Sequence, residues 1–318
     1  MRIRSCAGLI LALAAVAAPA QTSTGGVTRI IVPFAAGGVQ DILARAISQE
    51  LGTAVGRSVI VENRPGAGGT IGTALVAKSA PDGHTLVLAA ASHTINGSLH
   101  AKLPYDPIRD FSGVAHIGTV EYVLMINPRI PAKTVREFVD YAKANPGKLN
   151  YATAGSGTAT HLSMAYFAAL AGIDMVQVPY KGTNEAVNEV LAGRADAVIA
   201  ANIGALAFVK DARIRMLAVT SAKRSKFLPE LPPIADGVPG YEFDSWLGLL
   251  GPAGIPRATV DQINLAVASL LRDPTILDRL AKQGIEPQAL SPEAFDALLR
   301  ADFDKMARVV KASGARVE

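Results

Sequence analysis

The chain has 318 residues, with 31 lysines and arginines against 27 aspartates and glutamates, so its formal net charge at pH 7 is +4. This small excess, without a basic run interleaved with aromatic residues, excludes the charge pattern that is typical of nucleic-acid-binding proteins. The length is sufficient for a large hydrophobic core and for two domains.

The start of the chain has the three parts of a secretory signal peptide. Two arginines precede an apolar stretch at 6–18, and the A-x-A sequence Ala18-Pro19-Ala20 follows. We therefore expect a signal peptide at 1–20, cleavage near Ala20 and a periplasmic mature protein. The only cysteine, Cys6, would be removed as well, so the mature protein would need no disulfide.

From Arg29 onward, strand-like apolar runs alternate with amphipathic helical patterns. This alternation predicts an α/β fold with a largely parallel sheet. The first series has strands at 28–34, 58–63 and 84–90, helices at 39–51 and 70–79, and a polar loop at 92–98.

A second series begins near Glu121, and its elements follow the same alternation. The Pro- and Gly-rich segment 227–240 predicts a surface loop. Three helices close the chain, and the last begins after an N-cap at Ser291 and ends before Gly314. The expected strands of this series are 121–128, 148–155, 174–180, 195–201, 213–221 and 243–252, and its first helices lie within 133–147, 156–172 and 184–194.

The two series predict two α/β lobes. The first lobe would comprise 21–124 together with 246–318, and the second would comprise 125–245. Two strands that cross between the lobes, near 122–127 and 245–250, would form a hinge.

A glycine loop, Gly37-Gly38, connects the first strand to the first helix. The N–H groups at a helix start are unpaired within the helix, and the helix dipole adds positive potential there, so such a loop can bind a phosphate or carboxylate without a basic residue. The alternative is that the two glycines only shape a tight turn. Asp41 is more consistent with a first-turn acid that favours the helix dipole than with a ligand contact.

No cofactor or metal is expected. The glycine loops lack the full G-x-G-x-x-G spacing, and there is no G-x-x-x-x-G-K-[ST] motif. The five histidines show no H-x-x-x-H or H-E-x-x-H spacing, and no cysteine supports a metal site.

Eight motifs in series resemble the Bug family, the periplasmic solute-binding receptors of tripartite tricarboxylate transporters. Each motif alone is weak, but together they span essentially the whole mature chain in order. They lie at 32–41 (VPFAAGGVQD), 61–72 (VENRPGAGGTIG), 81–86 (PDGHTL), 103–111 (LPYDPIRDF), 150–162 (NYATAGSGTATHL), 178–182 (VPYKG), 217–224 (LAVTSAKR) and 248–256 (GLLGPAGIP).

This resemblance implies a two-lobed periplasmic-binding-protein fold, type II-like, with the ligand in the cleft between the lobes. It implies a monomeric receptor, not an enzyme, that captures a small carboxylate and delivers it to membrane permease subunits. Family ligands include di- and tricarboxylates, acidic amino acids and aromatic acids, and a carboxylate is usually held by backbone amides, hydroxyls and waters.

Carried over by motif, the resemblance implies a ligand site with contributions from both lobes. Each contribution follows the end of a predicted strand. The expected ligand-binding residues are Phe34, Ala35, Ala36, Gly37, Gly38, Gln40, Ser92, His93 and Thr94 from the first lobe, and Ser156, Gly157, Thr158, His161, Tyr180 and Lys181 from the second.

Two positions depart from the family pattern. Gln40 replaces what is often a small hydroxyl residue, and Ala200-Ala201 occupies a strand end where related receptors often have an acid. A ligand ammonium would lack a partner there. The sequence therefore favours a ligand that is not an amino acid.

Two other functions remain open at this point. Ser156 and His161 could form a nucleophilic pair of a secreted α/β hydrolase. Five residues apart on one helix, however, they would lie about 140° apart around its axis. A sensory co-receptor that signals through a sensor kinase is the other alternative, and the sequence does not separate it from a transport receptor.

Overall fold

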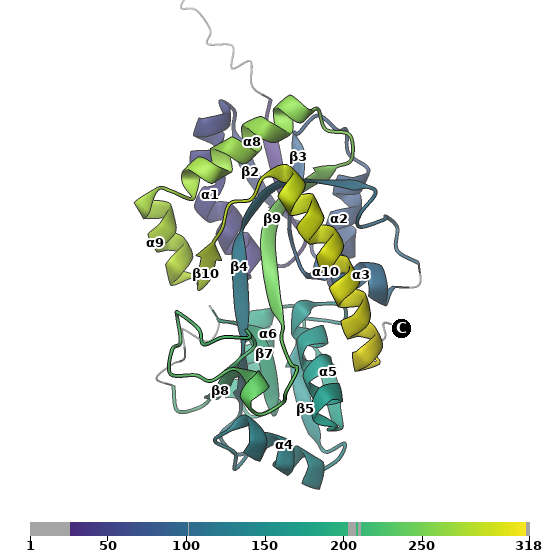
Figure 1. Cartoon of the computed structure of the whole chain (residues 1–318), viewed down its shortest axis with the longest axis vertical. Helices are drawn as coiled ribbons and strands as arrows, with labels where there is room; N and C mark the ends of the chain where they lie inside the picture. Colours follow the sequence, from purple (N-terminus) through teal and green to yellow (C-terminus); the bar gives the residue numbers. More distant parts are fainter. Residues whose placement is uncertain (1–25, 101, 203–207, 209–210, 316–318) are drawn as a thin grey trace, which may run out of the picture.

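The computed structural model describes residues 26–100, 102–202, 208 and 211–315. The signal peptide expected at 1–20 lies outside them. The chain forms two α/β lobes that lie end to end and share one continuous sheet (Figure 1). Strands run in the order β2-β1-β3-β9-β4-β7-β5-β6, with β8 and β10 also paired to β4.

The first lobe contains the sheet around β1, which is parallel to both β2 and β3. Because helices cover this sheet, Ile30, Ile31 and Val32 of β1 are all fully buried. Its strands are β1 (Thr28–Val32), β2 (Val59–Asn63), β3 (Thr85–Ala90), β9 (Asp244–Pro252), β10 (Ile285–Pro287) and the first part of β4 (Phe111–Ile126).

The second lobe is built around β5, which pairs in parallel with β6 and β7. Parallel pairing within each lobe agrees with the predicted alternation of strands and helices. Antiparallel pairs occur as well, and each of them involves β4 or β9, so the sheet is mixed rather than largely parallel as expected from the sequence. The strands of this lobe are β5 (Leu149–Thr153), β6 (Met175–Pro179), β7 (Ala197–Ala201), β8 (Arg215–Val219) and the last part of β4.

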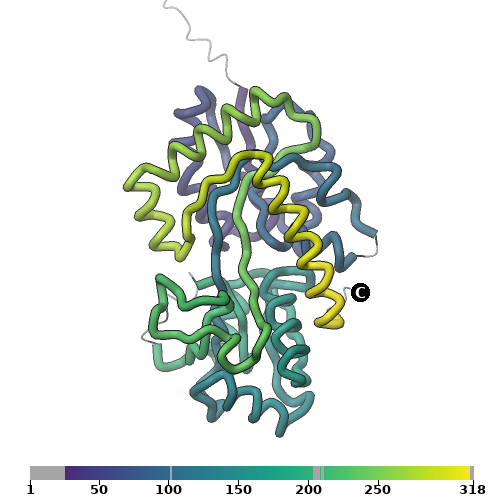
Figure 2. The backbone as a smooth tube through the Cα atoms, viewed as in Figure 1, coloured from purple at the N-terminus to yellow at the C-terminus, as the bar shows by residue number. Residues whose placement is uncertain are grey.

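The hinge contains β4 and β9, which run side by side between the lobes (Figure 2). From Phe111 to Glu121, β4 pairs with β9, whereas from Tyr122 to Ile126 it pairs with β7. On the chain before β9, the N–H of Phe243 donates to Thr220 O of the second lobe at 3.0 Å. The lobe boundaries inferred from the sequence stay a prediction.

The strand expected to begin near Glu121 begins ten residues earlier, at Phe111, the first residue of β4. The register shifts between Gly113 and Ala115 and again between His116 and Gly118. These irregularities break the alternation of apolar and polar residues, and glycine is a weak strand former, so the first part of β4 has little strand signal.

The loop expected at 92–98 is a helix, α3 (Ser92–Leu99). Its Asn96-Gly97-Ser98 segment has low helix propensity, but tertiary packing overrides this preference. Ile95 is fully buried, and a Cβ at Gly97 would lie 2.6 Å from Phe303 and from Pro107. Only glycine permits this close approach.

The remaining helices surround the sheet in both lobes. The final helix, α10, extends from the first lobe to the second and packs against both α3 and α5 (Figure 1). It begins at the predicted N-cap, where Ser291 Oγ accepts from Ala294 N at 3.2 Å. The helices are α1 (Val39–Val55), α2 (Thr70–Ala77), α4 (Val135–Ala144), α5 (Ala159–Ala171), α6 (Thr183–Leu191), α8 (Arg257–Leu270), α9 (Pro274–Lys282) and α10 (Pro292–Ser313), with short 3₁₀ turns η1 (Ala67–Gly69) and η2 (Ile234–Asp236).

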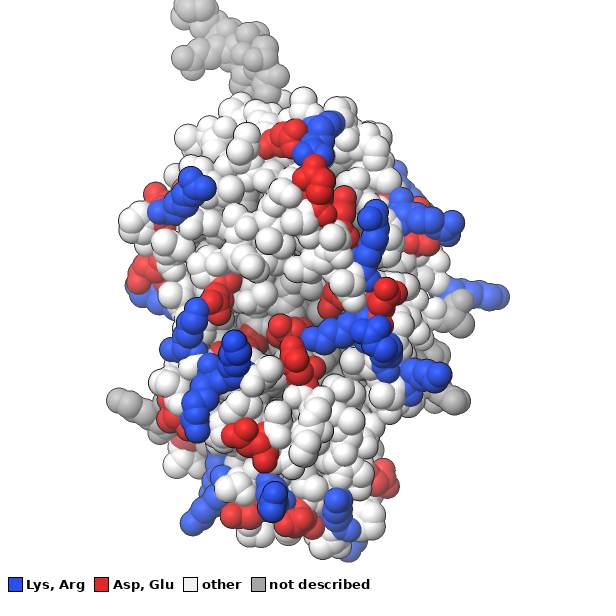
Figure 3. Space-filling model, in the orientation of Figure 1, with Lys and Arg blue, Asp and Glu red and all other residues white. Residues whose placement is uncertain are grey.

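The surface agrees with the near-neutral composition. On the face in Figure 3, cationic and anionic side chains are interspersed rather than gathered by sign. Within the described residues, no helix is both long enough and apolar enough to cross a membrane.

Candidate functional site

A cavity of about 240 Å³ lies between the two lobes. Its walls come from the ends of β1, β3, β5 and β6 and from the helix starts that follow them. In open α/β sheets, ligands bind at these carboxyl ends of parallel strands. The cavity therefore lies where the fold places loops free to contact a ligand.

A second hollow of about 380 Å³ lies at the hinge, but most of its charged groups already have partners. Lys226 forms an ion pair with Glu286, and Glu121 accepts a hydrogen bond of 2.9 Å from Ser221 Oγ. We therefore place the candidate ligand site in the cavity between the strand ends.

Eight of the fifteen predicted site residues line this cavity. They come from both lobes, as the motifs imply, although their contact with a ligand stays a prediction. These residues are Phe34, Ala35, Ala36, Gly38, Gln40, Ser92, Thr158 and Lys181.

Gly37 is not among the lining residues, and both of its polar groups are paired. Its N–H donates to Asp41 Oδ2 at 2.9 Å, and its carbonyl accepts from Asn184 Nδ2 at 3.2 Å. Its φ of +83° is in the left-handed region, which favours glycine, as the expected tight turn requires. Asp41 therefore acts as a first-turn acid that caps the loop. Its carboxylate also forms an ion pair with Arg45 at 2.9 Å.

His93 and Thr94 point into the first lobe instead of the cavity. His93 Nε2 lies 2.8 Å from Pro107 O, and its ring packs edge-on against Phe111. Burial lowers the pKa of His93 to about 4, so the ring is neutral at pH 7. Thr94 Oγ1 lies 2.6 Å from Asp302 Oδ2. Both side chains stabilise the packing of α3.

His161 and Ser156 do not form a nucleophilic pair. Among the described hydrogen bonds, His161 Nδ1 accepts from Gly157 N at 3.3 Å, and Ser156 Oγ accepts from Gln177 Nε2 at 3.4 Å, but none joins the two side chains. Burial lowers the pKa of His161 to about 4. His161 therefore shapes the loop before α5.

Gly157 and Tyr180 also lie away from the cavity. A Cβ at Gly157 would lie 2.5 Å from Asn96 Oδ1 of the first lobe, so this glycine is a point of contact between the lobes. The Tyr180 hydroxyl is turned toward Glu189 Oε2, 3.5 Å away.

Sequence reasoning missed eleven lining residues, most of them neighbours of predicted ones. The rule that sites form at the carboxyl ends of parallel strands could have found those in the loops. The sequence marked Ala201 only as a strand end without an acid, and Tyr122, which faces Ala201 across β4 and β7, had no such signal. The missed residues are Val39, Ala90, Tyr122, Ala154, Ala159, Thr160, Gly182, Thr183, Asn184, Glu185 and Ala201.

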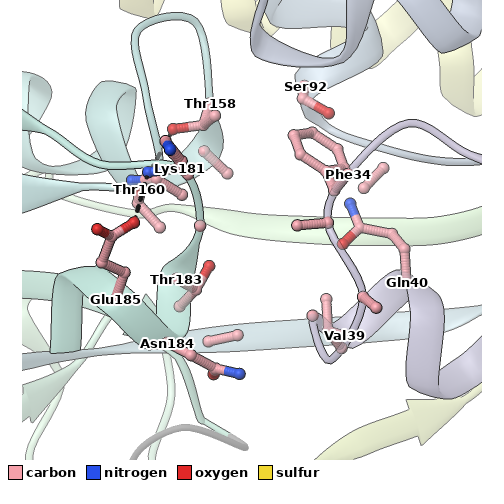
Figure 4. A pocket seen from close by; sticks show the side chains of 18 of the residues that line it. Phe34, Val39, Gln40, Ser92, Thr158, Thr160, Lys181, Thr183, Asn184 and Glu185 are labelled. Atoms are coloured by element: carbon pink, nitrogen blue, oxygen red, sulfur yellow. Dashed lines mark hydrogen bonds between the residues drawn. The ribbon is translucent and has the colours of Figure 1, made fainter. Parts of the chain in front are cut away.

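Polar groups occupy both sides of the cavity (Figure 4). Ser92 and Gln40 lie on the first-lobe side, opposite Thr158, Lys181 and Thr183 on the second-lobe side. The starts of α1, α5 and α6 all border the cavity. Helix N-termini favour anions, so three dipoles add positive potential.

Formal charge contributes little to this site. Of the lining residues, only Lys181 is cationic and only Glu185 is anionic. The Glu185 carboxylate accepts from Lys181 N at 3.0 Å, which is an N-terminal capping arrangement for α6. Burial raises the pKa of Tyr122 to about 12, so its hydroxyl is neutral at pH 7.

Most of the remaining wall is apolar. Phe34, Val39 and the ring of Tyr122 contribute the larger surfaces. Small side chains complete it, and these are Ala35, Ala36, Ala90, Ala154, Ala159 and Ala201.

Two α/β lobes, a paired-strand hinge and a cavity between strand ends define a periplasmic binding protein. The model of the family described as "Tripartite tricarboxylate transporter family receptor" matches residues 43–315. This chain belongs to that family, whose periplasmic receptors include the Bug proteins that its motifs resemble. The family comprises binding proteins, not enzymes.

Three solved structures are similar to the chain over nearly their whole length. Rpa4515 of R. palustris, solved with adipate, is 33% identical with a TM-score of 0.86, covering 91% of this chain and 98% of that one. The periplasmic binding protein BugD is 31% identical with a TM-score of 0.85, covering 92% and 99%. MatC from Rhodopseudomonas palustris, with bound malate, is 30% identical with a TM-score of 0.82, covering 89% and 98%.

Proposed function

We propose that the protein is an extracytoplasmic solute receptor that captures a small carboxylate between its lobes and delivers it to the permease of a tripartite tricarboxylate transporter. One observation carries this proposal. Neutral donors and three helix starts face a cavity in which Lys181 is the only lining cation. Such sites bind oxyanions through oriented N–H groups rather than through arginine.

The cavity wall supports a ligand with an apolar body. A hydroxyl on the body of the ligand would lose its water without gaining a partner against the alanines, Phe34 and Val39. Adipate and malate are dicarboxylates held by relatives of this chain. We therefore favour a dicarboxylate of the adipate kind, with one carboxylate toward Gln40 and Ser92 and the other toward Lys181 and Thr183.

The same wall supports a ligand without an ammonium group. Ala201 lines the cavity, and Ala200 is fully buried on the opposite side of β7. The only lining carboxylate, Glu185, is engaged with Lys181 N. An amino acid would bury its ammonium with weak compensation, which is unfavourable.

Capture would proceed by closure of the two lobes about β4 and β9. A carboxylate that satisfies donors on both sides binds the closed form better than the open one, so it shifts the population toward closure. The permease would recognise that form. No cofactor takes part in this mechanism, and the receptor would act as a periplasmic monomer after cleavage near Ala20.

A thermal-shift panel tests the ligand class. Adipate and malate should raise the melting temperature, and adipate should raise it more, whereas glutamate and aspartate should have little effect. Native mass spectrometry of protein purified without refolding should then reveal a bound small acid. A panel in which the acidic amino acids stabilise most would contradict the ligand class, and no response to any carboxylate would contradict the receptor function.

The partner needs its own experiment. Crosslinking in membranes from the source cells, followed by affinity purification, should recover permease subunits. Recovery of a sensor kinase without any permease would favour the signalling alternative.

A further inference from the structure

A hydrogen bond joins the lobes beside the cavity. Asn184, the second residue of α6 in the second lobe, donates from Nδ2 to Gly37 O of the first lobe at 3.2 Å. Figure 4 shows its amide extended from α6 toward the loop before α1. Asn184 lines the cavity, but its side-chain donor is used on the opposite lobe.

The loop that receives this bond is held within its own lobe at two other points. Asn63 Nδ2 donates to Phe34 O at 3.1 Å, and Gly37 N donates to Asp41 Oδ2 at 2.9 Å. Arg45 joins these two anchors, because it contacts both Asp41 Oδ1 and Asn63 Oδ1. These contacts lie within the first lobe and survive separation of the lobes, whereas the bond from Asn184 does not.

The geometry of Gly37 suits this role. Its φ of +83° is one that favours glycine, and a Cβ there would lie 3.4 Å from Asn184 Nδ2, whose amide donates to its carbonyl. The loop carries the lining residues Phe34, Ala35 and Ala36. A side chain of the second lobe therefore holds the same loop that carries these lining residues of the first lobe.

We propose that Asn184 is an interlobe latch, a positioning residue that stabilises the closed receptor without a required contact to the ligand. This inference rests on the proposed function, since the latch affects binding only if the ligand is enclosed between the lobes. Because Asn184 is exposed at the mouth of the cavity, water competes for its amide. We expect the bond to favour the closed form about two- to fivefold, which is the lower part of the range for a neutral hydrogen bond.

The test measures the distance between the lobes by double electron–electron resonance. Spin labels are attached through Lys78→Cys and Lys143→Cys, at one exposed position in each lobe, in the mature protein, which would have no other cysteine. Asn184→Ala is compared with the wild type and with Asn188→Ala, a matched exposed asparagine one turn along α6. Each protein is measured without ligand and with millimolar adipate or malate.

Asn184→Ala should lower the closed-to-open ratio about two- to fivefold in every condition that populates the closed form, and Asn188→Ala should not. The melting temperature without ligand should match that of Asn188→Ala, which separates a latch from a purely structural role. Equal closed fractions in Asn184→Ala and the wild type would overturn the proposal, as would a wild type with no closed population. If the wild type closes but neither acid changes its distances, the proposed ligand class fails while the ligand-free comparison still decides the latch.

Discussion

At the scale of single residues, two predicted ligand contacts are buried, neutral histidines. His93 and His161 both have their pKa lowered to about 4 by burial, from an ordinary value of 6.5. Between these values the unfolded chain binds more protons than the folded one, so the free energy of unfolding rises with pH. The stabilisation is fully present above pH 6.5 and is lost as the pH falls toward 4.

We therefore expect the protein to lose stability between pH 6.5 and pH 5, by up to about 1.4 kcal/mol per pH unit for each histidine. Urea unfolding at pH 7, 6 and 5 measures this slope. His93→Phe should flatten the slope, although it also removes the contact of 2.8 Å with Pro107 O. A slope unchanged by this substitution would contradict the assigned pKa.

Ser92 is the clearest test of a single lining donor. It is buried and it lines the cavity on the first-lobe side (Figure 4). Ser92→Ala should weaken binding of a stabilising carboxylate by about 1 kcal/mol, which is one neutral hydrogen bond. Isothermal titration calorimetry measures the change, with the exposed Ser269→Ala as the control. Equal affinity in both variants would remove Ser92 from the site.

At the scale of elements, the glycines of η1 form a contact between the lobes. A Cβ at Gly68 would lie 2.6 Å from Ser156 O, and one at Gly157 would lie 2.5 Å from Asn96 Oδ1. Asn96 cannot easily move away, since its Nδ2 donates to Gly68 O at 3.0 Å. The loop from η1 and the loop before α5 therefore meet backbone to backbone.

Gly157→Ala should impede closure. Both Gly157, with φ +79°, and Gly172, with φ +63°, would strain an alanine, but a Cβ at Gly172 meets nothing within 4 Å. The two variants should lose similar stability without ligand, by about 1–2 kcal/mol. Only Gly157→Ala should also weaken ligand binding, by about 1–3 kcal/mol of overpacking. Matching affinities in calorimetry would show that the loops need not meet.

Elements with regular patterns could be predicted from the sequence, whereas those decided by tertiary contacts could not. The helix from Pro292 has its cap serine and its apolar face in the sequence, and its limits were close. α3 gave no local signal, because its glycine lowers the helix propensity of the segment. Gly97 is required there by tertiary packing, since a Cβ would lie 2.6 Å from Phe303. The first part of β4 was hidden by its bulges.

At the scale of the molecule, one cluster of buried apolar residues runs through both lobes. It includes Leu88 in the first lobe, Leu124 and Ile126 in β4, and Phe138 and Phe167 in the second lobe. The helix α10 packs on both sides of the junction. The lobes share their core through the hinge strands.

We therefore expect a single unfolding transition in scanning calorimetry, with equal calorimetric and van't Hoff enthalpies. A stabilising carboxylate should move the whole transition to higher temperature. Two resolved transitions, of which only one responds to ligand, would show that the lobes unfold independently.

The candidate site was partly predictable for the same reason as the fold. Loops at strand ends can be identified along the sequence, so residues such as Phe34 and Thr158 could be named. Tyr122 and Ala201 become neighbours only through strand pairing between β4 and β7. Gly37 and Asn184 are 147 positions apart, and no local pattern joins them.

The alanines of the cavity wall have a consequence for the range of ligands that the proposed receptor would accept. Because alanine side chains are small, the ligand can fill most of the cavity. A larger apolar side chain at one of these positions would reduce the cavity volume without removing a side-chain hydrogen-bond donor. Enlargement of one, such as Ala201→Val, would shorten or narrow the acceptable acid while its headgroup contacts remain. Substitutions of these alanines can therefore change the preferred length of the ligand while the groups that bind its charged ends stay the same.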